Sequence, residues 1–230
     1  RRRHRPAIRY AQPPDPAGGV LGSLYPTGNP VDSITINGES VEYSLVDVTN
    51  PCVYVRASDL GLAGSELPDE LSATAGLLDR FEAIRGAVCE QIGRVDDAAD
   101  ASDESPTVPF IAAVSAPQSY EQSNGGRVEA ADIDVTARIV TTQTPHHAYA
   151  MTGAMCLGAA ARLPGTIPNE VAGGDGAGVT IGHPKGTISV DATVDAAVPS
   201  VESVTVGRTM RPLVDGSFYY RYAGELADLA

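Results

Sequence analysis

Short segments of alternating hydrophobic and polar residues, separated by turn residues, predict that strands occupy most of this chain. Residues 41–48 (VEYSLVDV) alternate with the period expected of a strand that has one buried face. The Asn37-Gly38 pair before them is typical of a two-residue hairpin turn. Similar patterns or short apolar runs predict further strands within residues 34–38, 52–57, 108–117, 133–142, 179–194, 201–213 and 217–222.

Two segments have the pattern of helices. Apolar residues recur at three- and four-residue spacing through residues 69–94, which predicts one helix with an apolar face. Residues 152–162 are apolar on most sides and are followed by Pro164-Gly165, which predicts a buried helix that ends there. The acidic stretch 95–107 has no periodicity and is predicted to be an exposed, mobile loop. We therefore expect an α+β fold in which a mixed or antiparallel sheet wraps around a buried central helix.

The chain is strongly acidic, with a net charge of −13 over 230 residues. This charge argues against a nucleic-acid partner, because binding to phosphates needs a cationic face. Lys185 is the only lysine, and the other basic residues are arginines. Abundant Asp and Glu with scarce Lys predict a halophilic surface. An ordinary acidic surface in a protein from a GC-rich genome is the alternative.

Cysteine usage and hydropathy predict a cytoplasmic protein. The three cysteines are widely spaced and form no CxxC pair, which fits unpaired thiols in a reducing compartment. No apolar run reaches the roughly 20 residues that cross a bilayer, so we expect no membrane association. The basic, proline-rich residues 1–19 lack the apolar core of a signal peptide. They are either a disordered tail or a truncated start of a larger protein.

The most distinctive polar cluster directly precedes the predicted buried helix. A helix start presents free N–H groups and a partial positive charge, so Thr152, Gly153 and Ala154 could bind an anion. A simple Thr152 N-cap is the alternative. His146 and His147, just upstream, are candidate acid or base groups. They could equally be structural hydrogen-bonding residues. A metal site is not expected here, because the nearby sequence offers no third ligand.

Three turn-like segments add candidate binding residues. The GHPKG turn offers His183, Lys185 and Gly186 to a carboxylate, or is an ordinary hairpin turn. Asn50 precedes a predicted strand and could contact a carboxylate or cap a turn. The PTGNP segment is either a ligand loop or a type II turn after a proline, and its candidates are Thr27, Gly28 and Asn29. We expect no cofactor, because neither a P-loop nor a dinucleotide-binding glycine motif is present.

Five segments in order carry a family resemblance. LYPTGNPVD, NPCVYVRASDLGLAGSELP, HHAYAMTGAMCLGAAARLPGT, IGHPKG and VGRTMRPLVDG resemble the 2-methylaconitate cis–trans isomerase (PrpF) family, which includes oxalomesaconate tautomerase and methylitaconate isomerase-type enzymes. The resemblance covers about residues 16–222. It implies a diaminopimelate epimerase-like fold, with two lobes that each wrap a sheet around a central helix. The helix starts would bind substrate carboxylates between the lobes, here at Thr152 and Gly153, with Asn50 nearby.

The chain also departs from the family pattern. Where the epimerases have a catalytic cysteine before the helix, this chain has Ala150 or Met151, and Lys185 replaces a serine. The acid–base segments of the family's first lobe are not found. The resemblance thus divides the chain into a basic start (1–19), the remainder of the first lobe (20–58) and a complete second lobe (59–230).

The implied reaction is a proton shift in an unsaturated di- or tricarboxylic acid such as 2-methylaconitate or aconitate, without a cofactor. The weak candidates for the acid–base groups are His146, His147 and Lys185. The alternative is a non-catalytic partial lobe, either a truncated remnant or a subunit that needs a separate first lobe. Expected partners are a small carboxylate and either a second copy of the chain or the missing lobe.

Overall fold

The computed structural model describes residues 7–11, 20–174, 176, 178–207 and 216–217. The strands are β1 (Ala7–Ala11), β2 (Asp32–Ile36), β3 (Glu39–Val46), β4 (Cys52–Arg56), β5 (Phe110–Ser115), β6 (Tyr120–Glu121), β7 (Arg127–Val128), β8 (Val135–Thr141), β9 (Thr144–Pro145), β10 (Gly178–His183), β11 (Gly186–Asp195) and β12 (Ser200–Gly207). The helices are α1 (Pro68–Ala73), α2 (Leu77–Gln91), α3 (Ala101–Glu104), α4 (Met151–Ala160) and α5 (Ile167–Val171), with short 3-10 turns η1 (Ala57–Leu60), η2 (Ala98–Asp100) and η3 (Ala130–Asp132).

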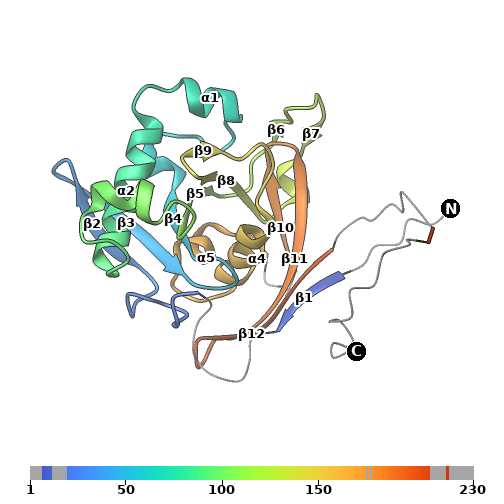
Figure 1. Ribbon diagram of the computed structural model, residues 1–230. Helices are drawn as coiled ribbons and strands as arrows, with labels where there is room; N and C mark the ends of the chain where they lie inside the picture. Colours follow the sequence, from blue (N-terminus) through green and yellow to red (C-terminus); the bar gives the residue numbers. More distant parts are fainter. Residues whose placement is uncertain (1–6, 12–19, 175, 177, 208–215, 218–230) are drawn as a thin grey trace.

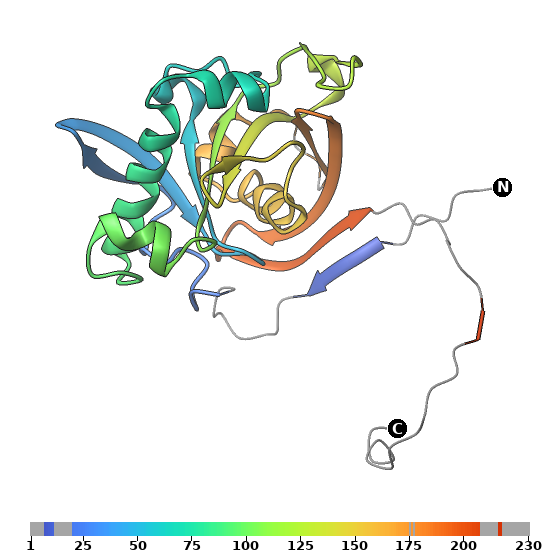
Figure 2. The same cartoon turned by 45° about the horizontal axis from the view of Figure 1, so that its top comes forward.

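One mixed sheet runs through the described chain in the order β1-β12-β11-β10-β8-β5-β4-β3-β2, and β9 pairs with β8. The pairs β4–β5 and β8–β10 are parallel, and the other pairs are antiparallel. The strands curve around α4 and α5, while α1 and α2 lie outside them (Figures 1 and 2). The expected α+β fold, with a mixed sheet around a buried central helix, is confirmed.

Helix α4 is buried because small residues let the curved sheet approach it. Residues Gly153 to Ala160 of α4 are all buried. A Cβ on Gly158 would lie 2.5 Å from Val190 Cγ1 of β11, and one on Gly153 would lie 2.6 Å from Ile139 Cδ1 of β8. Glycine at both positions is therefore required by close packing on two sides of the helix.

A second core lies on the opposite face of the sheet, under α2. Tyr43, Phe81 and Ile84 are fully buried in it. The single helix predicted for residues 69–94 is wrong, because the chain breaks between α1 and α2 at Gly76, whose φ is +71°. The break turns α2 so that its apolar residues pack on the sheet.

The acidic segment 95–107 also differs from the prediction. It forms η2 and α3, and Ala101 is fully buried. The buried guanidinium of Arg85 donates a 2.7 Å hydrogen bond to the Ser105 carbonyl, which fixes the segment against α2. Composition alone indicated a mobile loop here, but a cation from another element holds this segment in place.

Other predictions have mixed outcomes. The hairpin at Asn37-Gly38 is confirmed, because Ile36 pairs with Glu39 and both turn residues have positive φ. Residues 218–222 of the predicted strand 217–222, the end of 201–213 and most of 1–19 lie outside the described residues. Residues Ala7–Ala11 form β1, which pairs with β12, so the alternative of a disordered tail is wrong for this part of the start. The division at residue 58 stays a prediction, and strands on both sides of it pair as β4 and β5. Within the described ranges, none of the helices is long and apolar enough to cross a membrane.

Candidate functional site

The start of α4 is an uncapped helix terminus. The N-cap is Ala150, with extended backbone, and no side chain caps the first turn. Acidic residues are absent from that turn. Thr152 is the second residue of the helix and is exposed, so the alternative of a Thr152 N-cap is wrong. Gly153 and Ala154 are buried, and the Ala154 N–H already donates to the Ala150 carbonyl at 2.8 Å, so the prediction that Ala154 binds an anion through its N–H is wrong. The free N–H groups and the positive end of the helix dipole are therefore left for an external acceptor.

The connection between β3 and β4 lies beside this helix start. Thr49, with φ +65°, donates from its hydroxyl to the Thr152 carbonyl at 2.8 Å. The half-buried Asn50 donates from its amide to the carbonyls of Pro51 at 3.2 Å and Thr107 at 3.4 Å. Asn50 therefore fixes the loop next to the helix start.

Sheet topology brings His146 and His183 together. Strand β5 pairs with one edge of β8, so β9 and β10 share the other edge. Strand β10 ends at His183, on this second edge of β8. His146 follows β9 on the same edge, where its N–H donates to the Ile139 carbonyl of β8 at 2.9 Å. Two histidines that are 37 positions apart in sequence thus meet along one strand edge.

The two histidines are held in defined tautomers. His183 is only 8% exposed, and its Nδ1 accepts from the Lys185 N–H at 3.2 Å. Burial, followed by the charges of Arg138 and His146, lowers the pKa of His183 to about 4. The half-buried His146 accepts from the Ala148 N–H at Nδ1, 3.1 Å away. Burial, and then the charges of His147 and Lys185, lower its pKa as well. Both imidazoles are therefore neutral near pH 7 and carry their proton on Nε2.

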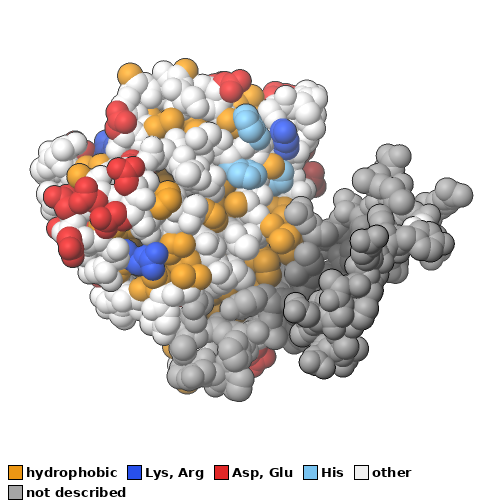
Figure 3. All heavy atoms as spheres, in the orientation of Figure 1, with side chains coloured by type: hydrophobic (Ala, Val, Ile, Leu, Met, Phe, Trp, Pro, Cys, Tyr) orange, Lys and Arg blue, Asp and Glu red, His pale blue; other side chains and the backbone are white. Residues whose placement is uncertain are grey.

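We call His146, His147, His183 and Lys185 the histidine cluster. Figure 3 shows the visible histidines gathered beside a basic side chain, while the largest acidic group lies on the other side of the view. Lys185 and His147 are exposed. In the described part of the chain, none of the four forms an ion pair with a carboxylate. No set of three or more described His, Cys, Asp or Glu side chains could hold a metal ion.

Sequence reasoning missed Arg138 and Tyr120, which lie beneath this cluster. Arg138, on β8, is 1% exposed, and its guanidinium stacks 4.7 Å from the centroid of the Tyr120 ring. It donates to the carbonyls of Glu66 and Ala137, while its Nη2 has no partner among the described residues. The available signal was a charged arginine in the middle of a strand whose other residues are apolar or threonine, but the neighbours of this arginine come from distant segments.

The structure does not bring Thr27, Gly28 and Asn29 to the α4 start. A Cβ on Gly165 would lie 3.4 Å from Pro30, which places this segment beyond the opposite end of α4. The Gly28 N–H donates to the Tyr25 carbonyl at 2.9 Å, so Pro26 and Thr27 are the central residues of the turn. The predicted type II turn through Gly28 and Asn29 needs a negative φ followed by a positive φ, but Gly28 has a φ of +88° and the φ of Asn29 is not positive. The type II interpretation is therefore wrong.

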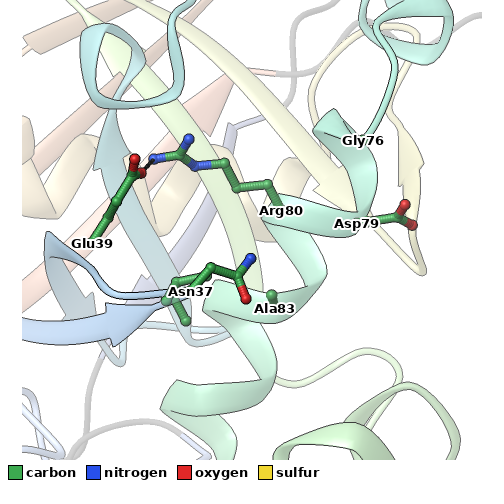
Figure 4. A pocket seen from close by; sticks show the side chains of 7 residues that line it. Asn37, Glu39, Gly76, Asp79, Arg80 and Ala83 are labelled. Atoms are coloured by element: carbon green, nitrogen blue, oxygen red, sulfur yellow. Dashed lines mark hydrogen bonds and ion pairs between the residues drawn. The ribbon is translucent and has the colours of Figure 1, made fainter.

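A separate groove of about 340 Å³ lies between the β2–β3 hairpin and α2. Its lining residues are Ile36, Asn37, Glu39, Gly76, Asp79, Arg80 and Ala83. Arg80 reaches across it to Glu39 at 3.0 Å, so its charge is already paired (Figure 4). None of the predicted site residues lines this groove.

The sequence matches one protein family and several isomerases of that family. The model of the PrpF protein family matches residues 9–221. The chain is 39% identical over 212 residues to 3-methylitaconate isomerase of Eubacterium barkeri, covering 91% of this chain and 55% of that protein. It is 33% identical over 213 residues to 2-methyl-aconitate isomerase of Shewanella oneidensis, covering 91% and 53%.

A solved structure agrees with the sequence matches. The crystal structure of methylitaconate-delta-isomerase superposes with a TM-score of 0.77 at 37% identity, over 84% of this chain and 51% of that one. The chain therefore spans about half the length of the relatives that it matches. The match to the family model covers nearly all of the sequence, and the chain belongs to the PrpF family.

Proposed function

We propose that this chain provides a carboxylate-binding site for a cofactor-independent isomerase that moves a proton in an unsaturated di- or tricarboxylic acid. The observation that carries the proposal is the uncapped start of α4, with no acidic residue in its first turn. A carboxylate would accept hydrogen bonds from its free N–H groups and gain from the helix dipole. The names of the similar isomerases support this substrate class.

The histidine cluster supplies a second favourable region for an anion. His146 and His183 are neutral, with Nδ1 already accepting a backbone N–H, so each can donate only from Nε2. Lys185 adds a cation, and the buried Arg138 adds a fixed positive charge. Fixed donors and charges of this kind stabilise an enolate-like anion without reorganising as it forms.

The proton shift itself needs a base and an acid. A base removes the proton from a carbon next to a carboxylate, and the electron pair delocalises over the conjugated system. A proton then returns to another carbon, so the product is an isomer with no net change in atoms. The engaged Nδ1 atoms of His146 and His183 make them donors to the anion, which leaves His147 and Lys185 as the chain's candidates for proton transfer.

The test is isomerisation and binding of aconitate and 2-methylaconitate, followed by ultraviolet absorbance and by calorimetry. Thr152→Asp places a carboxylate at the helix start, where it should stabilise α4 by about 0.3–1 kcal/mol while it competes with the ligand. Thr35→Asp, an exposed threonine on β2, is the control for added charge. We expect binding and turnover to be lost only in Thr152→Asp. Equal affinity in both variants would refute a carboxylate site at the start of α4.

We further propose that the substrate is a tricarboxylic acid and that the protein works in a salt-rich, reducing cytoplasm. Lys185 beside His146 favours a ligand with an additional carboxylate. The three buried, unpaired thiols and the net charge of −13 support the cellular conditions. If the unfolding temperature does not rise between dilute and molar KCl, the halophilic assignment is wrong.

A further inference from the structure

The β6–β7 hairpin packs directly on the turn that carries His183 and Lys185. The Tyr120 hydroxyl lies 2.9 Å from the His183 carbonyl and 3.2 Å from the Gly186 carbonyl, and it can donate to both in alternation. The Ser123 N–H donates to the Pro184 carbonyl at 2.8 Å. Three carbonyls of the turn, those of His183, Pro184 and Gly186, are therefore held by a segment about sixty residues earlier in the sequence.

Tyr120 is itself rigidly supported. It is 6% exposed and forms a small core with Val128 and Ile133. A Cβ on Gly182 would lie 2.9 Å from the Tyr120 hydroxyl oxygen, so the ring fits against bare backbone of β10. Its other contact is the stacked guanidinium of Arg138, whose Nε donates to the Glu66 carbonyl. A ring enclosed in this way holds its hydroxyl in one place.

We propose that Tyr120 is a positioning residue, whose hydroxyl holds the His183–Gly186 turn on the edge of β8 that His146 also uses, so that His183 and Lys185 are placed to meet an anionic ligand. The claim that the held turn helps to bind an anionic ligand rests on the proposed carboxylate site. The holding of the turn is a property of the free protein and can be measured without any ligand.

The removal of one oxygen tests this role. Tyr120→Phe keeps the ring, its packing on Gly182 and its stacking with Arg138, and it deletes only the donor to the two carbonyls. Tyr43→Phe is the matched control, because Tyr43 is also buried and its hydroxyl donates to the Gln91 side chain at 2.8 Å, in the other core. Both variants lose one buried hydroxyl, so general destabilisation affects them alike.

Lys185 provides a clean signal, because it is the only lysine in the sequence. Protein labelled with ¹⁵N-lysine shows a single backbone amide, which is the N–H that donates to His183 Nδ1. We expect Tyr120→Phe to speed hydrogen exchange at this amide about threefold to tenfold, the effect of one lost hydrogen bond, and Tyr43→Phe to leave it within about twofold. The dissociation constant for trans-aconitate should rise by a similar factor only in Tyr120→Phe.

Ser123→Pro is a second variant, which removes the other hydrogen bond to the turn without altering the core. It should also speed exchange at Lys185. Unchanged exchange in Tyr120→Phe would overturn the proposal, whatever Ser123→Pro does, as would equal acceleration in Tyr43→Phe. Faster exchange with unchanged trans-aconitate affinity would overturn the claim that the held turn helps to bind an anionic ligand. If the wild-type chain binds no trans-aconitate, the carboxylate site fails, and exchange at Lys185 alone decides whether Tyr120 holds the turn.

Discussion

Replacing Gly158 by alanine should destabilise the protein, although alanine is the better helix former. The new Cβ would lie 2.5 Å from Val190 Cγ1 and 2.8 Å from Val190 Cβ, against the roughly 3.5–4.0 Å at which carbon atoms attract. A rotation of the Val190 side chain moves Cγ1 but leaves Cβ in place. Helix α4 and strand β11 must therefore separate, and both are buried here.

Two opposing effects set the magnitude. Alanine gains about 1 kcal/mol over glycine within a helix, while overpacking of a filled core costs about 1–3 kcal/mol. Because the clash involves an atom fixed to the backbone, we place the cost at the upper end and expect a net loss of about 1–2 kcal/mol. The sign of the change thus reports whether the sheet really closes on α4.

Urea unfolding followed by circular dichroism measures this free energy, provided that the slope of the transition is unchanged. Val190→Ala removes both methyl groups that face Gly158 and provides the second half of a double-mutant cycle. Gly158→Ala should cost less in the Val190→Ala background than in the wild type. Stabilisation by about 1 kcal/mol in the wild-type background would instead mean that helix propensity acts alone, and the close packing described above would be refuted.

Three further predictions concern charge and burial. The pKa of His183 is about 4 in the folded chain against 6.5 as its ordinary value, so unfolding takes up a proton between these values and stability falls as pH drops through that window. The free energy of unfolding should fall by about 2 kcal/mol between pH 7 and pH 5. The urea midpoints at these two pH values should therefore differ less in His183→Gln than in the wild type, and an equal difference would contradict the lowered pKa of His183. All three cysteines are buried, and burial raises the pKa of each thiol, so a disulfide reagent should label them only after urea unfolding, and fast labelling of the native chain would contradict their burial. Arg56 bridges Glu42 on β3 and Glu170 on α5 at the protein surface; Arg56→Met should cost about 1 kcal/mol or less at low salt, and a loss that does not shrink in molar KCl would show that packing matters more than charge.

Local sequence rules predicted the elements that depend on neighbouring residues. The Asn37-Gly38 hairpin follows from two residues that accept positive φ, and the burial of α4 follows from its lack of any polar face. The break at Gly76 was missed because the apolar spacing continues across it. Only the packing of α2 on the sheet separates the two helices.

The candidate site was predictable only in part. The helix start and the nearby histidines were visible in the sequence, but the sequence left open whether Thr152 caps the helix, and only the structure shows that it does not. The meeting of His146 with His183 depends on β9 and β10 sharing one edge of β8. The roles of Arg138 and Tyr120 arise from contacts between distant segments, which no spacing rule contains. Thr27, Gly28 and Asn29 resembled a ligand loop because turns and binding loops use the same residues.

The measurement that tests the central claim most directly is the response of the α4 backbone amides to a carboxylate ligand. In ¹H–¹⁵N spectra with trans-aconitate added, the amides of Met151, Thr152 and Gly153 should shift in a saturable manner, and they should not shift in Thr152→Asp. This result would place the carboxylate at the start of α4. Shifts confined to other surfaces, or none at a concentration that saturates binding, would contradict a carboxylate site at this helix.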